Sequence, residues 1–475
     1  MLRRVTLAGL FGVALVFGSP ACSSDASPAG DTGPANAAPT SSASKDGGTT
    51  ATNDGGAGDG DAKATPTDSD GVLIGGPGPL PGAIAGIAYK SGKFEGTTDA
   101  KGTFHYEVGG TITFSIAGVA LATVPAKAKL SPFALAGGAC TANDALRRVL
   151  VTLETLDADG KPETGIALPP IAAKAGETRT LAAMPSGDYD TWLGALSQGK
   201  AKADETAALT RFIEQVDGEA WATPDPLAFD TATSATRSQG VVFDGSGYVF
   251  SWTLGLQRTD TNLAVTVNKT AAIPIDMLIG GSSHIGDVDL HQGTLYAPIE
   301  DKKYEKPTIV LFDPMTLNEK GQRFAIPTSI LSQGVPWIAV DGKKQVAYLS
   351  QWDPIPAIEV FDLATFAHKT SIPLSKPMGR IQGAKVSGSS LYTASDDAEK
   401  SVHKIDLDTG IVLPKLFDYG GAAVVKELEG LTFMPAAAGT PAKLRVLGVA
   451  GTGSSVTFFT HARTRAPLRD DVCGP

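Results

Sequence analysis

The second half of the chain alternates apolar and polar residues in short runs broken by turns, and this pattern recurs five times. Each copy predicts a strand, a turn and a second strand, because apolar side chains at every second position cover one face of a strand. The copies begin with QGVVFD at Gln239, IGDVDL at Ile285, WIAVDG at Trp337, QGAKVS at Gln382 and EGLTFM at Glu429. Their starts lie 46, 52, 45 and 47 residues apart.

A third strand with a shared ending follows three of these hairpins. TIVLFDPMT, AIEVFDLAT and VHKIDLDTG each run into Asp-x-x-Thr, at Asp313, Asp362 and Asp406. An aspartate there can accept hydrogen bonds from its own turn, so we assign these three residues and Asp289 to structure. A weaker fourth strand completes each unit of about 45 residues.

Repeated units of four short strands predict a mainly β fold, a β-propeller of five or six blades over residues 234–470. Five blades are visible in the repeat, and the text from Trp221 to Ala235 could complete a sixth. A β-sandwich or a solenoid with accidental similarity is the alternative.

Residues 82–228 predict a small antiparallel β module with one or two helices. Short alternating runs are separated there by the turn signals DAKG and VGG. The spacing then changes to three and four, which predicts a helix with Asn143 or Thr141 as its N-cap. Its apolar face would carry Leu146, Val149, Leu150, Leu153 and Leu156. A second helix is predicted by Leu209, Phe212, Ile213 and Val216.

The sequence LDADGKPE at the end of the first helix admits two interpretations. Asp157, Asp159 and Glu163 could ligate calcium, but an EF-hand loop needs ligands at five or six positions and a glutamate at about the twelfth. We therefore favour a helix-ending turn.

Residues 1–22 predict an export signal: Arg3 and Arg4, an apolar run from Val5 to Phe17, and GSPAC ending at Cys22. The run is shorter than the roughly 20 residues of a membrane span. It resembles a bacterial lipoprotein signal, which implies acylation of Cys22 and a cell-envelope protein of the outer membrane or periplasm. Because Ser19 stands where such signals usually carry leucine, ordinary cleavage and secretion is the alternative.

Residues 23–76 predict a disordered tether. From Ser23 to Gly71 there is no Leu, Ile, Val, Met, Phe, Tyr or Trp, so this segment cannot offset its chain entropy by burial. The segment contains eight Asp and two Lys, so it carries −6 of the chain's formal net charge of −10. The rest is only mildly acidic and carries no basic patch, which excludes an obvious nucleic-acid partner.

The two further cysteines, Cys140 and Cys473, could pair in an exported chain. Two free buried thiols are the alternative. Because the chain has no CxxC and no Cys/His cluster, a structural zinc site is not expected.

The repeat separates scaffold from candidate site. In a propeller, the segment leading into the first strand of each blade and the loop between its second and third strands share one face, where sites are commonly built. Residues at these places that depart from the repeat are Gln239, Trp252, His284, Glu300, Asp301, Trp337, Trp352, Asp353, Arg380, Gln382, Asp396, Asp397, Glu427 and Glu429. Asp287 would lie one step inside the channel.

Clustered carboxylates need a cation, an arginine or raised pKa values to coexist. Calcium suits such oxygen ligands, and its predicted ligands are Asp287, Glu300, Asp301, Asp396 and Asp397. The tryptophans suit an apolar or sugar ring. The predicted ligand-binding residues are His284, Trp337, Trp352, Asp353, Arg380, Gln382, Glu427 and Glu429.

Three phrases carry a resemblance: HIGDVD with LYAPIED from His284, GVPWIAVD from Gly334 and RIQG from Arg380. They resemble a group of exported bacterial β-propeller lipoproteins and, more distantly, olfactomedin- and gluconolactonase-type propellers. Residues 82–166 resemble a module of bacterial surface lipoproteins. These resemblances imply a fold and a location but no activity.

Two hypotheses on function follow. The chain has no GxSxG, no HExxH and no phosphate-binding glycine loop in the right context. We therefore expect a membrane-anchored lipoprotein whose propeller binds a protein, carbohydrate or small molecule, with or without calcium. The alternative is a calcium-dependent hydrolase of the lactonase or phosphoesterase type, with His284 or a carboxylate as general base.

Overall fold

The computed structural model describes residues 67–76, 82–138, 140–174, 176–420, 425–437, 442–450 and 455–467. The predicted signal peptide with Cys22, most of the predicted tether and Cys473 lie outside these residues. Cys140 forms a disulfide, whereas the pairing predicted for it with Cys473 falls partly outside the described chain. No helix in the described ranges is long and apolar enough to cross a membrane.

The predicted boundary of the tether at residue 76 is wrong, because a strand already begins at Asp68. Strand β1 (Asp68–Leu73) pairs antiparallel with β5 (Thr103–Glu107) and parallel with β8 (Lys129–Leu130). Leu73 is fully buried and Ile74 nearly so. Burial of Leu73 and Ile74 therefore anchors the polar residues before them, whose backbone pairs with β5.

The N-terminal module contains two further groups of strands. A four-stranded sheet has the order β4 (Phe94–Thr97), β3 (Ala88–Ser91), β6 (Thr111–Ile116) and β7 (Val119–Pro125). A parallel pair joins β2 (Ile84–Ala85) to β9 (Ile166–Ala167). In the core of the N-terminal module, Phe104 and Phe114 pack edge to face with 5.5 Å between their ring centroids.

The module's helices include both of those predicted. Helix α2 (Asp144–Leu156) starts at Asn143, whose Oδ1 accepts a hydrogen bond from Ala145 N at 2.8 Å, and its five predicted apolar residues are all buried. Helix α4 (Glu205–Val216) carries the second predicted apolar face. The remaining helical segments of the module are α1 (Pro132–Leu135), η1 (Pro162–Thr164) and α3 (Ser186–Leu196).

The sequence LDADGKPE forms a turn in which aspartates accept backbone hydrogen bonds. Lys161 N donates to Asp159 Oδ1 at 2.8 Å and to Asp157 Oδ2 at 3.1 Å, and Ala167 N donates to Asp157 Oδ1 at 2.9 Å. These bonds confirm the interpretation as a helix-ending turn.

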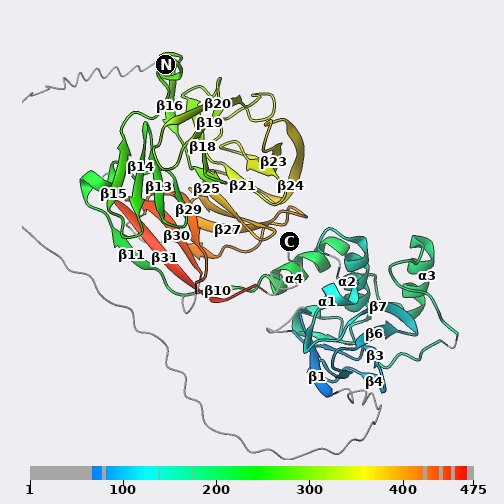
Figure 1. Cartoon of the computed structure of the whole chain (residues 1–475). Coiled ribbons are helices and arrows are strands. Elements are labelled where there is room, and N and C mark those ends of the chain that lie inside the picture. The colour runs from blue at the N-terminus through cyan, green and yellow to red at the C-terminus, as the bar shows by residue number, and fades with distance from the viewer. Residues whose placement is uncertain are drawn as a thin grey trace, which may run out of the picture. The chain divides into compact units, whose positions relative to one another are not determined.

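The described residues of the C-terminal half form five antiparallel sheets that follow one another along the chain (Figure 1). The first contains β12 (Val241–Phe243), β13 (Gly247–Trp252), β14 (Gly255–Asp260) and β15 (Val265–Lys269). The second contains β16 (Ser282–Ile285), β17 (Asp289–His291), β18 (Thr294–Asp301), β19 (Thr308–Phe312) and β20 (Glu319–Ala325). Helix α6 (Ile275–Ile279) lies between these two sheets in the chain.

The other three sheets repeat this order. The third contains β21 (Ala339–Asp341), β22 (Val346–Leu349), β23 (Ile355–Asp362) and β24 (His368–Met378). The fourth contains β25 (Ile381–Ser387), β26 (Ser390–Ser395), β27 (Ser401–Asp406) and β28 (Phe417–Asp418). The fifth contains β29 (Glu427–Met434), β30 (Lys443–Val449) and β31 (Val456–Arg465).

The fifth sheet gains its outer strands from the other end of the repeat region. Strands β10 (Ala220–Trp221) and β11 (Asp225–Ala228) both pair antiparallel with β31, and helix α5 (Thr231–Ser234) leads from β11 to the first sheet. The segment that could have completed a sixth blade therefore belongs to the fifth sheet.

The innermost strands of the five sheets lie beside one another. Strand β12 contacts β17 and β29, β21 contacts β17 and β25, and β25 contacts β29. Glycine allows their close approach, since a Cβ atom on Gly430 would lie 2.7 Å from Gly240 Cα and one on Gly383 would lie 2.6 Å from Gly430 Cα. The recurring Gly of the sequence pattern thus marks crowded backbone.

The Asp-x-x-Thr turns have the predicted structure. Asp313 Oδ1 accepts hydrogen bonds from Thr316 N and Oγ1 at 2.8 and 3.0 Å. Asp362 and Asp406 bind Thr365 and Thr409 in the same way. These aspartates are therefore turn residues.

Candidate functional site

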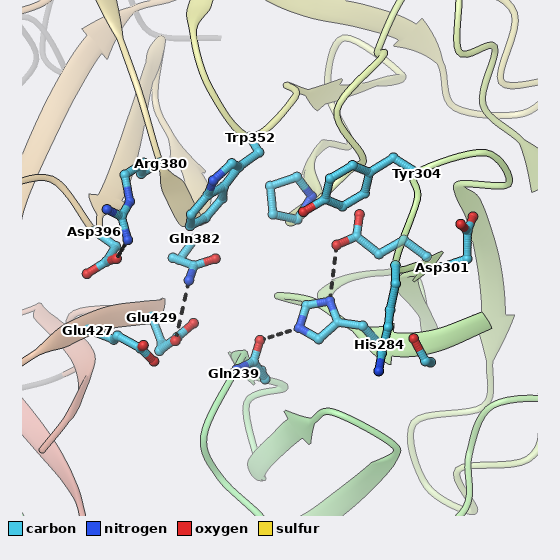
Figure 2. A pocket seen from close by; sticks show the side chains of 14 residues that line it. Gln239, His284, Asp301, Tyr304, Trp352, Arg380, Gln382, Asp396, Glu427 and Glu429 are labelled. Carbon is cyan, nitrogen blue, oxygen red and sulfur yellow. Dashed lines mark hydrogen bonds and ion pairs between the residues drawn. The ribbon is translucent and has the colours of Figure 1, made fainter. Parts of the chain in front are cut away.

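A pocket of about 380 Å³ lies at one end of the five sheets (Figure 2). There the first strand of each sheet begins and its second strand ends. Its lining residues are Gln239, Ser283, His284, Glu300, Asp301, Lys302, Tyr304, Pro336, Trp352, Arg380, Gln382, Asp396, Glu427 and Glu429. Residues from all five sheets or the segments leading into them contribute to this lining. Ten of the fourteen were singled out from the sequence, and His284 and Glu429 share the pocket although 145 positions separate them.

One wall is built around His284 on β16. Its Nε2 lies 2.6 Å from Gln239 Oε1 and its Nδ1 lies 3.2 Å from Glu300 Oε1. The second oxygen of Glu300 accepts a hydrogen bond from Val335 N at 2.8 Å. Both ring nitrogens thus lie within hydrogen-bonding distance of side-chain oxygens.

The opposite wall is built around Arg380, which follows β24. Its guanidinium pairs with the Asp396 carboxylate and lies 5.3 Å from the ring centroid of Trp352. Arg380 has φ +55°, a left-handed conformation that is unfavourable for residues other than glycine. Two backbone hydrogen bonds hold it there: Arg380 N donates to Trp352 O, and Asp396 N donates to Arg380 O, both at 2.7 Å. The local fold therefore fixes all three residues together.

A buried glutamate lies beside these walls. Glu429 on β29 is only 1% exposed, yet it lines the pocket. Gln382 Nε2 donates to its Oε1 at 3.5 Å, and within the described ranges no donor contacts its Oε2. Burial raises the pKa of Glu429 well above 4.5, and the nearby carboxylates of Glu427, Asp396 and Asp287 raise it further. The raised pKa favours the protonated form of Glu429.

Asp301 shapes the loop that carries Lys302 and Tyr304 to the pocket. Its two carboxylate oxygens accept hydrogen bonds from Lys303 N at 2.8 Å and from Lys306 N at 2.7 Å. Burial acts to raise the pKa of Asp301, but these backbone hydrogen bonds outweigh it and lower the pKa. The Asp301 carboxylate is thus engaged by its own loop.

Five predicted site residues do not line the pocket: Trp252, Asp287, Trp337, Asp353 and Asp397. Trp337 is fully buried, and its Nε1 donates to Ser350 Oγ at 3.0 Å, so the structure places it in the core instead. Trp252, named with the loop residues, is also outside the lining. Asp353 follows Trp352 as an exposed residue close to Gly379.

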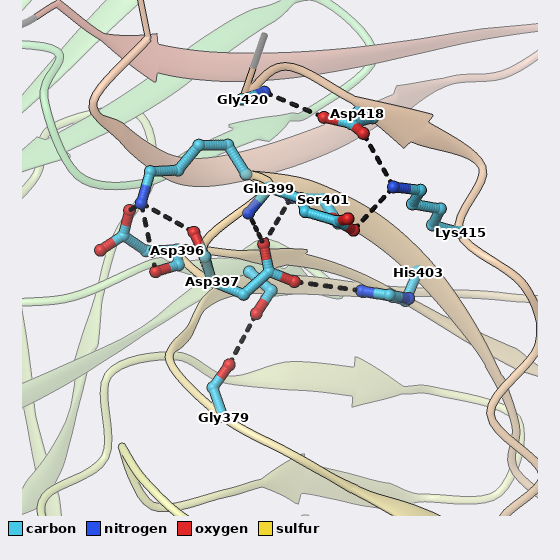
Figure 3. Close-up of polar contacts among 11 residues, drawn as sticks. Gly379, Asp396, Asp397, Glu399, Ser401, His403, Lys415, Asp418 and Gly420 are labelled. Carbon is cyan, nitrogen blue, oxygen red and sulfur yellow. Dashed lines mark hydrogen bonds and ion pairs between the residues drawn. The ribbon is translucent and has the colours of Figure 1, made fainter.

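Asp397 belongs to a turn next to the pocket (Figure 3). Its Oδ1 accepts hydrogen bonds from Glu399 N at 3.0 Å and Ser401 N at 3.2 Å, and its Oδ2 lies 3.4 Å from His403 Nε2. Its neighbour Asp396 pairs with Lys400 Nζ at 2.8 Å. The turn thereby directs the Asp396 carboxylate toward Arg380 and the Asp397 carboxylate toward His403, outside the pocket lining.

Asp287 joins three sheets rather than lining the pocket. Its Oδ1 accepts a hydrogen bond from Val241 N at 3.0 Å, and its Oδ2 accepts from Ala384 N at 3.1 Å and from Lys385 Nζ at 2.6 Å. Complete burial raises the pKa of Asp287 to about 7, against the opposing effect of Lys385. This is a buried ion pair at the meeting point of the first strands.

The five predicted calcium ligands are already paired within the protein. Both oxygens of each carboxylate contact a hydrogen-bond donor or a cationic nitrogen in this arrangement. Across the described residues, no three His, Cys, Asp or Glu side chains are grouped to hold a metal ion. These residues as placed do not fit a calcium ion, and calcium binding stays a prediction.

Sequence reasoning missed Ser283, Lys302, Tyr304 and Pro336. Each is the immediate neighbour of a residue that the repeat did mark, or lies within three positions of one. Tyr304 itself has the left-handed φ of +58° and lies three residues beyond Asp301, where no alternating pattern marks it.

No protein-family model matches the chain, and no curated protein matches it. Among solved structures, the chain is similar to a gluconolactonase from Xanthomonas campestris described as important in glucose secondary metabolic pathways. The two sequences are 14% identical, the match covers 51% of this chain and 97% of that chain, and the TM-score is 0.31.

Proposed function

We propose that residues 220–465 form a five-bladed β-propeller, closed by β10 and β11 on β31, whose pocket binds a small polyhydroxylated ligand such as a sugar or sugar acid. The five consecutive sheets support the blade number. The cyclic contacts of the innermost strands support the closure.

The chemistry of the lining supports this class of ligand. The main observation is that aromatic rings and hydrogen-bonding side chains line the same cavity. Trp352 and Tyr304 contribute aromatic rings to the lining, and such rings pack against sugars. Gln239 and Gln382 offer amides to hydroxyl groups, and a protonated Glu429 can donate a hydrogen bond where an ionised one cannot.

Calorimetric titration with a panel of monosaccharides, aldonic acids and uronic acids tests the proposal. We expect at least one compound to bind, and Trp352→Ala to weaken that binding by about fivefold or more, since a ring-stacking contact is worth about 1 kcal/mol or more. Trp192→Ala, which changes a half-buried tryptophan of the N-terminal module, is the matched control. A panel without any binder, or equal losses in both variants, contradicts the proposal.

A calcium-dependent hydrolase of the lactonase or phosphoesterase type is the second candidate. The arrangement of His284 between Gln239 and Glu300 favours it, because a histidine oriented by a carboxylate is a common general base. Screening lactones and phosphoesters with and without EDTA separates the two functions. Turnover that EDTA abolishes and His284→Ala removes would establish the hydrolase, and its absence would leave ligand binding alone.

We further propose that Cys22 is acylated and that the predicted tether holds the folded body at a membrane of the cell envelope. The export signal and the composition of residues 23–66 support this location. If the signal is cleaved without acylation, the same body is secreted.

A further inference from the structure

Four apolar side chains are exposed together beside the pocket. Ile275, Leu278 and Ile279 of helix α6 are 69%, 42% and 81% exposed, and Leu254 is 43% exposed. Leu254 adjoins the segment before the helix, because Ala272 N donates a hydrogen bond to Leu254 O at 2.8 Å. We call these four residues the apolar patch. Exposed apolar groups gathered at one place mark a surface that contacts something other than water.

Lysines border the apolar patch. The loop between β18 and β19 exposes Lys302, Lys303 and Lys306. Lys306 Nζ donates to Gly280 O at 3.1 Å, which brings this loop against the end of α6. Lys302 and Lys303 form no ion pair within the described part of the chain. These lysines leave the border of the patch positively charged.

The one carboxylate on α6 does not cancel this charge. Asp276 pairs with Arg323 at nitrogen–oxygen distances of 2.5 and 3.1 Å, and Glu319 shares the same guanidinium at 2.5 and 3.0 Å. Glu305 in the lysine loop offsets one of the three lysines. Arg323 and the three lysines of the loop thus outnumber Asp276, Glu305 and Glu319 by one charge. The surface therefore combines protruding isoleucine and leucine side chains with a net excess of cations.

We infer that the apolar patch and its lysines dock on the surface of a bilayer that contains anionic phospholipids. Apolar side chains that insert at the headgroup boundary, flanked by lysines that attract anionic headgroups, are the usual composition of such a surface. A stable protein interface uses about 20–30 residues on each side, far more than this patch supplies.

The location of the patch relates membrane docking to the pocket. Helix α6 leads within a few residues into Ser283 and His284, and the lysine loop contributes Lys302 and Tyr304 to the lining. A docked chain would therefore bring the side of the pocket formed by β16 and this loop close to the lipid surface. The inference rests on the exposed surface and not on which ligand the pocket takes.

Vesicle sedimentation tests this inference with the full chain carrying Cys22→Ala, so that no acyl chain contributes. We expect binding to vesicles that contain phosphatidylglycerol and weak or no binding to vesicles of phosphatidylcholine alone. The combined substitution Ile275→Ser, Leu278→Ser and Ile279→Ser should weaken binding about tenfold or more. Because a lysine near an anionic surface contributes about fivefold in affinity, Lys303→Glu with Lys306→Glu should also weaken it and reduce its salt dependence.

Met315→Ser is the matched control. Met315 is 57% exposed and lies in the Asp313 turn, after the end of β19 that is remote from the lysine loop. Thermal melts of all variants should coincide, since every changed side chain is exposed. Binding of the triple variant that equals that of the Cys22→Ala parent would overturn the inference. So would failure of that parent to bind phosphatidylglycerol vesicles, or a patch-dependent dimer in size-exclusion chromatography without vesicle binding.

Discussion

At the scale of single residues, most charged groups of the pocket are paired with an opposite charge, whereas within the described part of the chain the buried carboxyl group of Glu429 is not. Arg380 and Lys400 balance Asp396, and His284 contacts Glu300. Glu429 is buried and has only a long hydrogen bond from Gln382. The protonation of this one carboxyl group should therefore respond to pH and to a bound ligand.

The pH dependence of stability follows from Glu429. Its pKa in the folded protein lies above the ordinary value of 4.5, so its contribution to stability is complete below about pH 4.5 and is lost as the pH rises through the folded pKa. We expect Glu429→Gln, which keeps the neutral form, to reduce the loss of unfolding free energy on going from acidic to alkaline pH. Urea denaturation over this range measures the effect.

Glu305→Gln, at an exposed glutamate, is the control for that experiment. It should leave the pH profile of the parent in place. An unchanged profile in Glu429→Gln would mean that Glu429 is ionised and compensated in the folded protein.

The sequence predicted many of the pocket residues because the repeat identifies one end of each repeated sheet. It could not tell which side chains point into the pocket there. The pairing is irregular between Ser282 and His284, between Ile381 and Gly383, and between Leu428 and Leu431. Such bulges redirect side chains by one position and leave no mark in a two-residue periodicity.

At the scale of strands and sheets, the Asp287–Lys385 ion pair connects the innermost strands. Both side chains are almost fully buried, and Asp287 also binds backbone amides of the first and fourth sheets. We expect Lys385→Met to destabilise the fold by about 3–5 kcal/mol, because it leaves a buried carboxylate without its cation. Equilibrium denaturation checks this value.

The double variant Asp287→Asn with Lys385→Met should be less destabilised than Lys385→Met alone, since it removes the unpaired charge. Lys343→Met, at an exposed position, should change stability by less than about 0.5 kcal/mol. If Lys385→Met is as mild as this control, the pair does not hold the sheets together.

The strands of the repeat were predicted well because each is local, alternating in hydrophobicity and bounded by turn residues. The outer strands of the fifth sheet were not. Asp225–Ala228 pairs with Thr457–Thr460 across more than 200 positions, and its exposed residues carry no strand pattern. A partner so distant along the chain cannot be inferred from local periodicity.

At the scale of the whole molecule, we expect two independent attachments to a membrane, one at Cys22 and one through the apolar patch. Cys22→Ala should move most of the protein out of the membrane fraction of cells that export it, because a surface patch binds far more weakly than acyl chains. Cell fractionation with immunodetection measures this change. A variant that fractionates like the parent would contradict acylation at Cys22.

The central claim is that segments far apart in the sequence form one ligand pocket at the common end of five blades. The most direct measurement is a crystal structure of the chain with its best-binding sugar or sugar acid. We expect the ligand to lie between His284 and Glu429, against Trp352, in a ring of five blades closed by β11 on β31. A structure with His284 and Glu429 on opposite faces, or with the ligand bound outside this pocket, would contradict it.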